Sequence, residues 1–185
     1  DPLEATDSVA HGRPNAIAVI AAGPKGSLLS VPEMYMEKLA AGPRAAKVID
    51  MDAPVDFNIK KVANALQKEV SDITVMVLDR DRHDDLIKKI RQAGARVRLI
   101  TDGDVAGAIA PSLPDSGIDL LMGIGKSTEA VLAAVAVKIF GGAILARFKP
   151  KDKEEEESLK KIGIKDPKKV FRSEDLAKGD MLTFT

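Results

Sequence analysis

The chain has 185 residues, of which 28 are basic and 28 acidic, so its formal net charge at pH 7 is zero. A balanced charge provides no overall field to attract nucleic acid or an acidic membrane, and an aromatic content of 3% argues against modules that stack on bases. Cysteine is absent, which excludes disulfides and is typical of a cytoplasmic protein. No apolar run approaches the roughly 20 residues of a membrane span. We therefore expect neither a nucleic-acid nor a membrane partner.

The first 70 residues predict a hairpin and two helices. Asn15–Ala22 and Ser27–Ser30 have the pattern of two short strands joined by a glycine-rich turn. Pro32 is expected to open a helix that ends at Gly42-Pro43, because proline favours the first helical turn and a Gly-Pro pair stops a helix. After a short apolar segment, a second helix is expected from near Asp56.

Strands and helices alternate from Ile73 to Phe148. Ile73–Leu78 is a continuous apolar run, typical of a parallel strand buried on both faces. The elements expected next are a helix over Arg82–Ala93, a strand over Arg96–Ile100, a short helix over Asp104–Ala110, a strand over Ile118–Met122, a helix over Ser127–Phe140 and a strand over Ala143–Phe148. This alternation predicts a right-handed βαβ array with a mostly parallel sheet. A solvated charged helix within Lys149–Lys161, a short helix near Ser173–Ala177 and a final strand over Met181–Thr185 should follow.

Three loops follow the predicted strands, at the sheet edge where α/β proteins bind ligands. The first offers two arginines and a histidine, the second two carboxylates around a glycine, and the third a helix N-terminus and a glutamate: Asp79–His83, Thr101–Asp104 and Gly123–Glu129. Together they suggest a site for a polyhydroxylated phosphate ester. Each loop alone also has a structural explanation, since Asp104 suits an N-cap, Arg80 and Arg82 suit a solvated surface, and His83 suits a helix start.

The third loop is predicted to be a Gly-x-Gly turn formed by Gly123 and Gly125. The helix after it is so apolar that it should be buried between layers, and its free N–H groups favour an anion. A sheet-to-helix turn with a favourable Glu129 in the first helical turn explains the same residues. The run from Gly125 to Thr128 resembles the end of a nucleotide-binding P-loop. However, Leu120 stands where this motif requires a glycine, and the loop is too short to wrap a triphosphate, which argues against an NTPase.

Five motifs occur in the same order as in one enzyme family: DPLEAT at Asp1, PEMYMEK at Pro32, DRDRH at Asp79, ARVRLITDGD at Ala95 and MGIGKSTE at Met122. GIKDPKKVF near the end of the chain fits as well. The chain resembles the class II fructose-1,6-bisphosphatases, which belong to the lithium-sensitive, metal-dependent sugar and inositol phosphatases. The resemblance covers almost the whole chain.

The resemblance implies a fold, a reaction and a set of partners. The fold is a layered αβαβα sandwich in which residues 1–70 belong to a metal-site and hairpin subdomain, 71–150 to a parallel βαβ subdomain and 151–185 to a charged helix and C-terminal segment. The reaction is hydrolysis of the 1-phosphate of fructose-1,6-bisphosphate with Mn²⁺ or Mg²⁺, in gluconeogenesis or the Calvin cycle. Some bacterial members also act on sedoheptulose-1,7-bisphosphate. A homo-oligomer, dimer or tetramer, is expected.

The resemblance also assigns roles to residues. The implied metal ligands are Asp1, Glu4 and Glu129, and Thr6 would position the attacking water. The implied substrate-binding residues are Glu4, Ala5, Thr6, Tyr35, Arg80, Asp81, Arg82, Asp102, Gly103, Asp104 and Lys126. Metals would neutralise the phosphate and activate water, while arginines clamp the remote phosphate. From the residues alone, a frayed terminus is the favoured explanation of the acidic run after Asp1, and packing on a helix is the favoured explanation of Tyr35.

The chain departs from the family pattern in three respects. Ala5 replaces the usual glycine, which costs roughly 1–2 kcal/mol if that residue has a positive φ. Lys126 begins a Lys-Ser-Thr run that replaces a run of small residues, alanine and proline. The chain starts at Asp1 rather than a methionine, and the family has further metal carboxylates upstream and a further segment downstream. A polypeptide of these 185 residues alone is therefore expected to hydrolyse sugar bisphosphates poorly. A non-catalytic sugar-phosphate-binding module of the same fold is the alternative.

Overall fold

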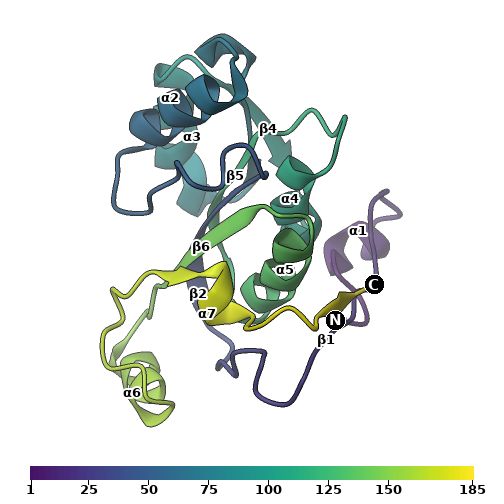
Figure 1. Ribbon diagram of the computed structural model, residues 1–185, viewed down its shortest axis with the longest axis vertical. Helices are drawn as coiled ribbons and strands as arrows, with labels where there is room; N and C mark the ends of the chain where they lie inside the picture. Colours follow the sequence, from purple (N-terminus) through teal and green to yellow (C-terminus); the bar gives the residue numbers. More distant parts are fainter.

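The computed structural model describes residues 1–185 and arranges most of them around one six-stranded mixed sheet (Figure 1). The strands follow the order β4-β3-β5-β2-β6-β7. Their bounds are β2 (Tyr35–Ala41), β3 (Thr74–Leu78), β4 (Arg96–Ile100), β5 (Leu120–Lys126), β6 (Ala143–Phe148) and β7 (Phe171–Arg172). The helices are α1 (Thr6–Ala10), α2 (Val55–Leu66), α3 (Asp84–Gln92), α4 (Asp104–Ile109), α5 (Ser127–Ile139), α6 (Lys153–Lys161) and α7 (Ser173–Leu176). Single 3-10 turns cover Val70–Asp72, Asp81–His83 and Ala110–Ser112.

Strands β4, β3, β5 and β6 run in one direction, and β2 runs against them. Strand β3 is parallel to both β4 and β5, whereas β2 lies between β5 and β6 and is antiparallel to both. Strand β7 is antiparallel to β6. The predicted α/β class is therefore confirmed, but the predicted parallel pairing holds only for β4, β3 and β5. The sheet is mixed because a strand from the first 70 residues is inserted between β5 and β6.

The helix predicted to begin at Pro32 is wrong, because this segment forms the central strand β2. Met36 and Ala40 pack on the side of α4 and α5, while Leu39 and Ala41 pack on the side of α2 and α3. A strand buried on both faces lacks the alternation of polar and apolar residues, so its apolar residues fit a helical stripe equally well. The pairing with β5 and β6 on either side decides the structure, not local propensity.

The predicted hairpin over residues 15–30 is also wrong. Only β1 (Ala21–Ala22) is a strand there, and it pairs with the C-terminal strand β8 (Thr183–Phe184). Leu28 forms an isolated bridge with Ala177. Both halves of the expected hairpin thus find partners in the last residues of the chain, and the two termini lie side by side (Figure 1).

The predicted Gly-x-Gly turn does not form, because strand β5 continues through both glycines to Lys126. The antiparallel pairing with β2 extends to this end of β5, where Lys126 lies opposite Tyr35. Helix α5 then begins directly at Ser127. The hydroxyl of Ser127 donates to the carbonyl of Pro32, and the N–H of Ser127 donates to the carbonyl of Met34. The start of α5 is therefore tied to the segment that leads into β2.

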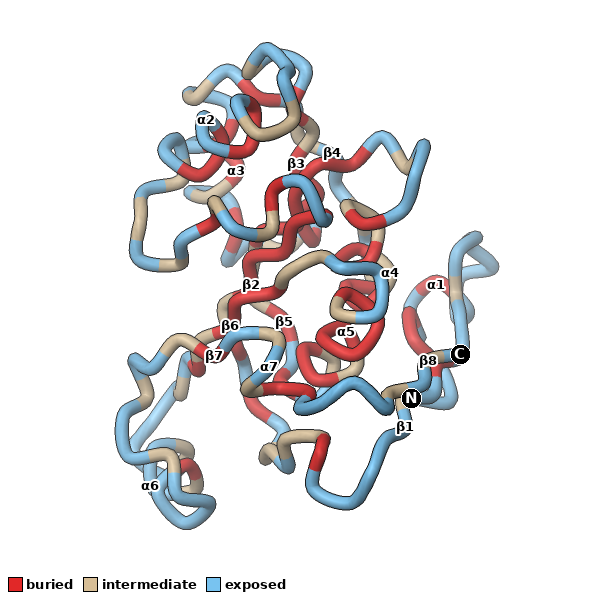
Figure 2. Tube along the Cα trace, in the orientation of Figure 1, coloured by how far each residue is buried: buried red, intermediate tan, exposed pale blue.

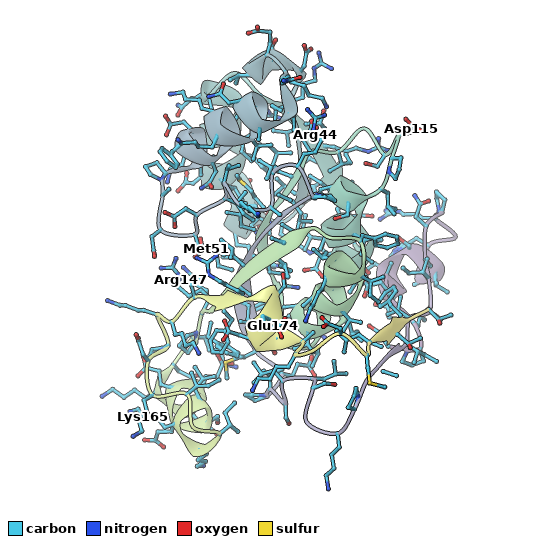
Figure 3. All side chains as sticks on the ribbon, viewed as in Figure 1. Arg44, Met51, Asp115, Arg147, Lys165 and Glu174 are labelled. Atoms are coloured by element: carbon cyan, nitrogen blue, oxygen red, sulfur yellow. The ribbon has the colours of Figure 1, made fainter.

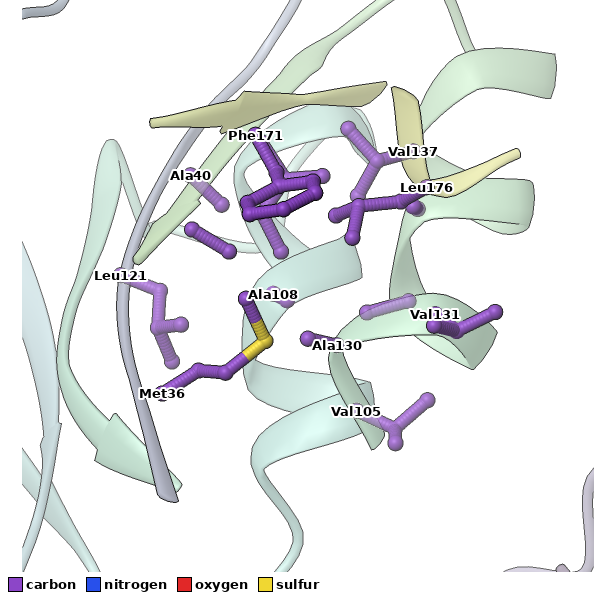
Figure 4. Packing of buried hydrophobic residues seen from close by; sticks show 14 of the residues in the cluster. Met36, Ala40, Val105, Ala108, Leu121, Ala130, Val131, Val137, Phe171 and Leu176 are labelled. Atoms are coloured by element: carbon purple, nitrogen blue, oxygen red, sulfur yellow. The ribbon is translucent and has the colours of Figure 1, made fainter. Parts of the chain in front are cut away.

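Helices cover both faces of the sheet and give three layers. On one face, Met36 and Leu121 of the sheet pack against Ala108 of α4 and Ala130 of α5 (Figure 4). On the other face, a second core joins the sheet to α2 and α3. Helix α5 is buried along most of its length, as the sequence predicts (Figure 2).

Polar side chains and the charged helix α6 lie around the perimeter. Arg147 on β6 donates to the carbonyl of Met51 at 3.0 Å and pairs with Asp52 at 2.9 Å (Figure 3). Helix α6 projects from the body, and most of its residues are exposed, as expected for the charged run (Figure 2). None of the helices has both the length and the apolar character needed to span a membrane.

Candidate active site

One sheet edge collects most of the predicted site. Strands β3, β4 and β5 are parallel, so their carboxyl ends meet at this edge. A pocket there is lined by Tyr35, Leu78, Arg80, Arg82, Asp102, Asp104, Gly125, Lys126 and Glu129. Tyr35 reaches the pocket for a reason that was not predicted: it is the first residue of the antiparallel strand β2, opposite Lys126. The structure thus brings seven of the predicted site residues into one cavity.

A cluster of charged side chains adjoins this pocket and contributes Asp104 and Glu129 to its lining. The ammonium group of Lys38, which is 2% exposed, contacts Asp104 Oδ2 at 2.6 Å and Glu129 Oε2 at 3.5 Å. The carboxylate of Glu4, 3% exposed, accepts the N–H of Val105 at 3.0 Å and so caps the start of α4. We call Lys38, Glu4, Asp104 and Glu129 the carboxylate cluster. It contains three acidic groups and one basic group.

Burial and mutual repulsion raise the pKa of two carboxyl groups in the cluster. The pKa of Glu4 rises to about 7, mainly because the group is removed from water, with further contributions from the charges of Asp104 and Glu129. The N–H of Val105 and the ammonium of Lys38 oppose this rise. Burial likewise raises the pKa of Glu129, and the neighbouring Asp104 adds to the effect. The cluster therefore favours positive charge, which Lys38 supplies only in part.

Gly125 allows the cluster to approach strand β5 closely. A Cβ atom built at Gly125 would lie 1.8 Å from Asp104 Oδ2 and 2.8 Å from Lys38 Nζ. Any side chain at this position would therefore push apart the Lys38–Asp104 pair. The sequence singled out Gly125 as part of a turn, but its role in the structure is to leave room for a carboxylate.

Basic groups line the mouth of the pocket. The guanidinium of Arg82 lies 4.9 Å from the centre of the Tyr35 ring and donates to the carbonyl of Ile124 at 2.8 Å. Lys126 pairs with Glu33 at 2.6 Å, and both side chains are largely exposed. Arg80 lies in the same lining. The pocket is therefore acidic at its base and basic at its mouth, an arrangement that suits a metal ion inside and an anion above it.

The second loop is tied to the N-terminal helix. Asp102 accepts the N–H of Asp7 at 3.2 Å, and its other oxygen accepts the N–H of Gly103 at 3.0 Å. A Cβ atom at Gly103, whose φ is +87°, would lie 3.7 Å from the Ala5 side chain and 4.0 Å from Glu4 Oε1. Residues 4 to 7 and 102 to 104 thus meet, although almost 100 residues separate them.

The remaining predicted residues lie outside the pocket lining. The carboxylate of Asp1 accepts the N–H of Leu3 at 3.0 Å, and no hydrogen bond or ion pair joins Asp1 to the carboxylate cluster. Thr6 is exposed at the start of α1, and Asp81 is exposed in the first loop. Of the three predicted metal ligands, the structure therefore brings together Glu4 and Glu129 but not Asp1.

The carboxylate cluster suits a hard divalent cation in its chemistry. No group of three or more His, Cys, Asp or Glu side chains forms a ready-made metal site. However, Glu4 and Glu129 supply carboxylate oxygens, the ligands that Mg²⁺ and Mn²⁺ prefer. In addition, Asp104 Oδ1 is buried without a hydrogen-bond partner. Glu4 and Glu129 would hold the ion, which would neutralise phosphate charge and lower the pKa of bound water. Glu129 has a structural role too, since it accepts the N–H of Lys126 at 2.9 Å.

Sequence reasoning missed Lys38 as part of the site. The residue lies in the segment assigned to a helix, where an isolated lysine suggests a solvated surface. The available signal was the spacing of Met34, Met36, Lys38 and Ala40, which place one face of a strand at intervals of two. A lysine in register with buried residues is expected to have an acidic partner.

Ala5, which replaces the usual glycine of the family, does have the positive φ that makes an alanine at this position strained. Its φ is 68° and its ψ 53°, the left-handed region, and the residue is 5% exposed. We expect Ala5→Gly to raise the free energy of unfolding by up to about 1 kcal/mol, because relief of a 1–2 kcal/mol penalty exceeds the extra chain entropy of glycine. Urea denaturation measures the change. In the control Ala177→Gly, at an alanine that is also buried but has a φ of −141°, the same substitution should be destabilising.

His83 joins the ends of β3 and β5. Its Nδ1 lies 2.8 Å from the carbonyl of Leu78, and its Nε2 lies 2.8 Å from the N–H of Ile124. The carbonyl requires a donor and the N–H requires an acceptor, so the neutral ring carries its proton on Nδ1. Burial lowers the pKa of His83, and the charges of Arg82 and Arg80 lower it further, against the effect of the Leu78 carbonyl.

This lowered pKa predicts a loss of stability in acid. Above pH 6.5, the unfolded-state value, the stabilising contribution of neutral His83 is complete; it is lost as the pH falls toward the lower folded-state pKa. In His83→Gln, an amide can still accept from Ile124 and donate to Leu78, so on going from pH 7 to 5 the variant should lose less stability, or gain more, than the wild type. Urea denaturation across this range tests the difference, and parallel curves would contradict it. Glu4, whose raised pKa acts in the opposite direction, is present in both proteins.

Comparison with known proteins identifies the family. Residues 1–185 match the family model described as "Bacterial fructose-1,6-bisphosphatase, glpX-encoded". The chain is 43% identical over 196 residues to a "D-fructose 1,6-bisphosphatase class 2/sedoheptulose 1,7-bisphosphatase" of Synechococcus sp. strain JA-2-3B'a(2-13), and 43% identical over 197 residues to the "Fructose-1,6-bisphosphatase class 2" of Haemophilus influenzae. Both matches cover 100% of this chain, but 56% and 59% of the relatives. The chain therefore spans less than two thirds of these relatives and belongs to the class II bacterial fructose-1,6-bisphosphatase family.

Proposed function

We propose that the protein of which this chain is a part hydrolyses the 1-phosphate of fructose-1,6-bisphosphate. The observation that supports this most is the pocket itself, where the buried carboxylate of Asp104 and the partly buried carboxylate of Glu129 share one lining with three basic side chains. Relatives that carry this name match the whole chain. Sedoheptulose-1,7-bisphosphate, which appears in the name of the Synechococcus relative, is a second proposed substrate.

The acidic and the basic residues of the site would have different tasks in the reaction. A divalent ion, Mn²⁺ or Mg²⁺, held by Glu4 and Glu129 would polarise the phosphate ester and provide activated water. Arg80, Arg82 and Lys126 would bind the anionic phosphates, while carboxylates of the second loop accept hydrogen bonds from sugar hydroxyls.

The other features implied by the resemblance remain proposals. Thr6 would position the attacking water and Asp1 would complete the metal site, which requires the N-terminal segment to close over the cluster. We also propose the αβαβα sandwich for the whole protein, a homo-oligomeric state and a cytoplasmic location. The division at residues 70 and 150 stays a prediction, although the observed sheet takes strands from all three segments.

A non-catalytic sugar-phosphate-binding module is the second candidate. The observation in its favour is Lys38, whose ammonium group already pairs with Asp104 and Glu129 inside the carboxylate cluster. A module of this kind would bind sugar bisphosphates without releasing phosphate.

Phosphate release from fructose-1,6-bisphosphate by the full-length protein, with Mn²⁺ or Mg²⁺, distinguishes these functions. We expect turnover that is lost in Glu129→Gln, because the variant removes a carboxylate ligand. Glu157→Gln, on the exposed face of α6, is the matched control and should retain activity. Bisphosphate binding without phosphate release at any metal concentration would support the module instead.

A further inference from the structure

Lys38 is a buried cation that ends the PEMYMEK motif, but the family resemblance assigns it no role. Its side chain is 1% exposed and its nearest acidic partner, Asp104, is 4% exposed. A long side chain with a charged end is normally found in water, and burial of its ammonium group is costly without a partner. The sequence places it on the inward face of the central strand β2, where its charge points at the site and not at solvent.

The charges around Lys38 are not balanced. The carboxylate cluster has three acidic groups for one ammonium, and Asp104 Oδ1 has no hydrogen-bond partner although it is buried. Asp104 and Glu129 also line the pocket, so the ammonium lies directly behind groups that face a ligand. The cluster can therefore accept a further cation, but any cation held by Glu129 meets the positive charge of Lys38 at short range.

We propose that Lys38 is a positioning residue that weakens divalent-cation binding to the carboxylate cluster until an anionic phosphate enters the neighbouring pocket. This inference rests on the proposed metal-dependent function, and it adds that the metal and the phosphate bind together. Lys38 keeps Asp104 and Glu129 in place while no metal is bound, and its repulsion of the metal disfavours an ion held without substrate. A phosphate between the metal and the basic mouth offsets this repulsion, so that metal and phosphate bind together.

The coupling follows from linkage. If phosphate raises the affinity for the metal, the metal must raise the affinity for phosphate by the same factor. The coupling in this site depends on the charge at residue 38, because removal of the ammonium removes the repulsion that phosphate would relieve. Tighter metal binding and weaker coupling are therefore expected together when Lys38 loses its charge.

Calorimetric titration of Mn²⁺ into the full-length protein tests the proposal, with and without inorganic phosphate. Lys38→Gln removes the charge but keeps a donor for Asp104, and Lys38→Met removes both. We expect Mn²⁺ to bind about tenfold more tightly to Lys38→Gln than to the wild type, the size of the repulsion between a divalent and a monovalent cation a few ångströms apart in a water-like dielectric. Phosphate should strengthen Mn²⁺ binding to the wild type more than to the variant. Lys60→Gln, on the exposed face of α2, removes one charge far from the site and should change neither value.

The outcomes separate this proposal from the proposed function. Unchanged or weaker Mn²⁺ binding in Lys38→Gln, with a circular dichroism spectrum like that of the wild type, would mean that Lys38 is only structural. The metal-dependent function would then still stand. Absence of Mn²⁺ binding in both proteins would overturn the metal site and this inference together. If Mn²⁺ bound more tightly to Lys38→Gln but not to Lys38→Met, the result would support the charge effect. It would also show that a hydrogen-bond donor at residue 38 is needed to hold Asp104 in place.

Discussion

Replacement of Lys38 by methionine is expected to lower the free energy of unfolding by about 3–5 kcal/mol, the cost of leaving a buried charge without its partner. Methionine has nearly the volume of lysine, so the change removes a charge without opening a large cavity. The carboxylate of Asp104, at 2.6 Å from the lost ammonium group, would remain buried beside Glu129. Urea denaturation at pH 8 measures the change.

Two comparisons show whether burial causes this effect. In the double variant Lys38→Met/Asp104→Asn most of the lost stability should return, because both members of the pair are then neutral. Lys126→Met removes a lysine whose ion pair with Glu33 is equally short at 2.6 Å, but the side chains of Lys126 and Glu33 are both more than half exposed. The cost there should be much smaller, since water screens an exposed pair. Similar losses for Lys38→Met and Lys126→Met would contradict the argument.

The sequence was sufficient where local pattern and burial agree. The continuous apolar run that forms β3, the amphipathic pattern of α3 and the apolar helix α5 all appear near their predicted positions. The loops after β3 and β4 follow from these elements, because parallel strands bring their carboxyl ends to one edge. The pattern of the sequence therefore suffices to predict that Arg82, Asp104 and Glu129 share one pocket, and the structure confirms it.

The remainder depends on contacts between distant residues. Strand β2 was mistaken for a helix because both of its faces are buried, and only its pairing with β5 and β6 reveals its structure. The hairpin failed because β1 pairs with β8, more than 150 residues away. The role of Lys38 could not be predicted either, because the residue contacts Asp104 only when its segment is a strand. The position of Glu4 at the start of α4 likewise joins two segments that no local pattern connects.

Arg82→Ala is expected to weaken the binding of a sugar bisphosphate by about 10- to 100-fold while Mn²⁺ binding changes little. A hydrogen bond to a charged group contributes about 1.5–3 kcal/mol, which corresponds to this loss. Arg82 suits this role because its position is fixed before the ligand arrives: the Tyr35 ring supports its guanidinium at 4.9 Å and the carbonyl of Ile124 accepts from it at 2.8 Å. A side chain held in this way loses less conformational entropy on binding.

The matched control for Arg82→Ala is Arg91→Ala, which removes an exposed arginine from the last turn of α3. Calorimetry of the full-length protein with Mn²⁺ alone, and then with a sugar bisphosphate, separates the two affinities. Arg91→Ala should behave like the wild type in both titrations. Tyr35→Phe keeps the aromatic face beneath Arg82 and should retain most of the substrate affinity, whereas Tyr35→Ala should lose part of it. If Arg82→Ala weakened Mn²⁺ binding as much as bisphosphate binding, Arg82 would act by holding strand β5 through Ile124 and not by contact with phosphate.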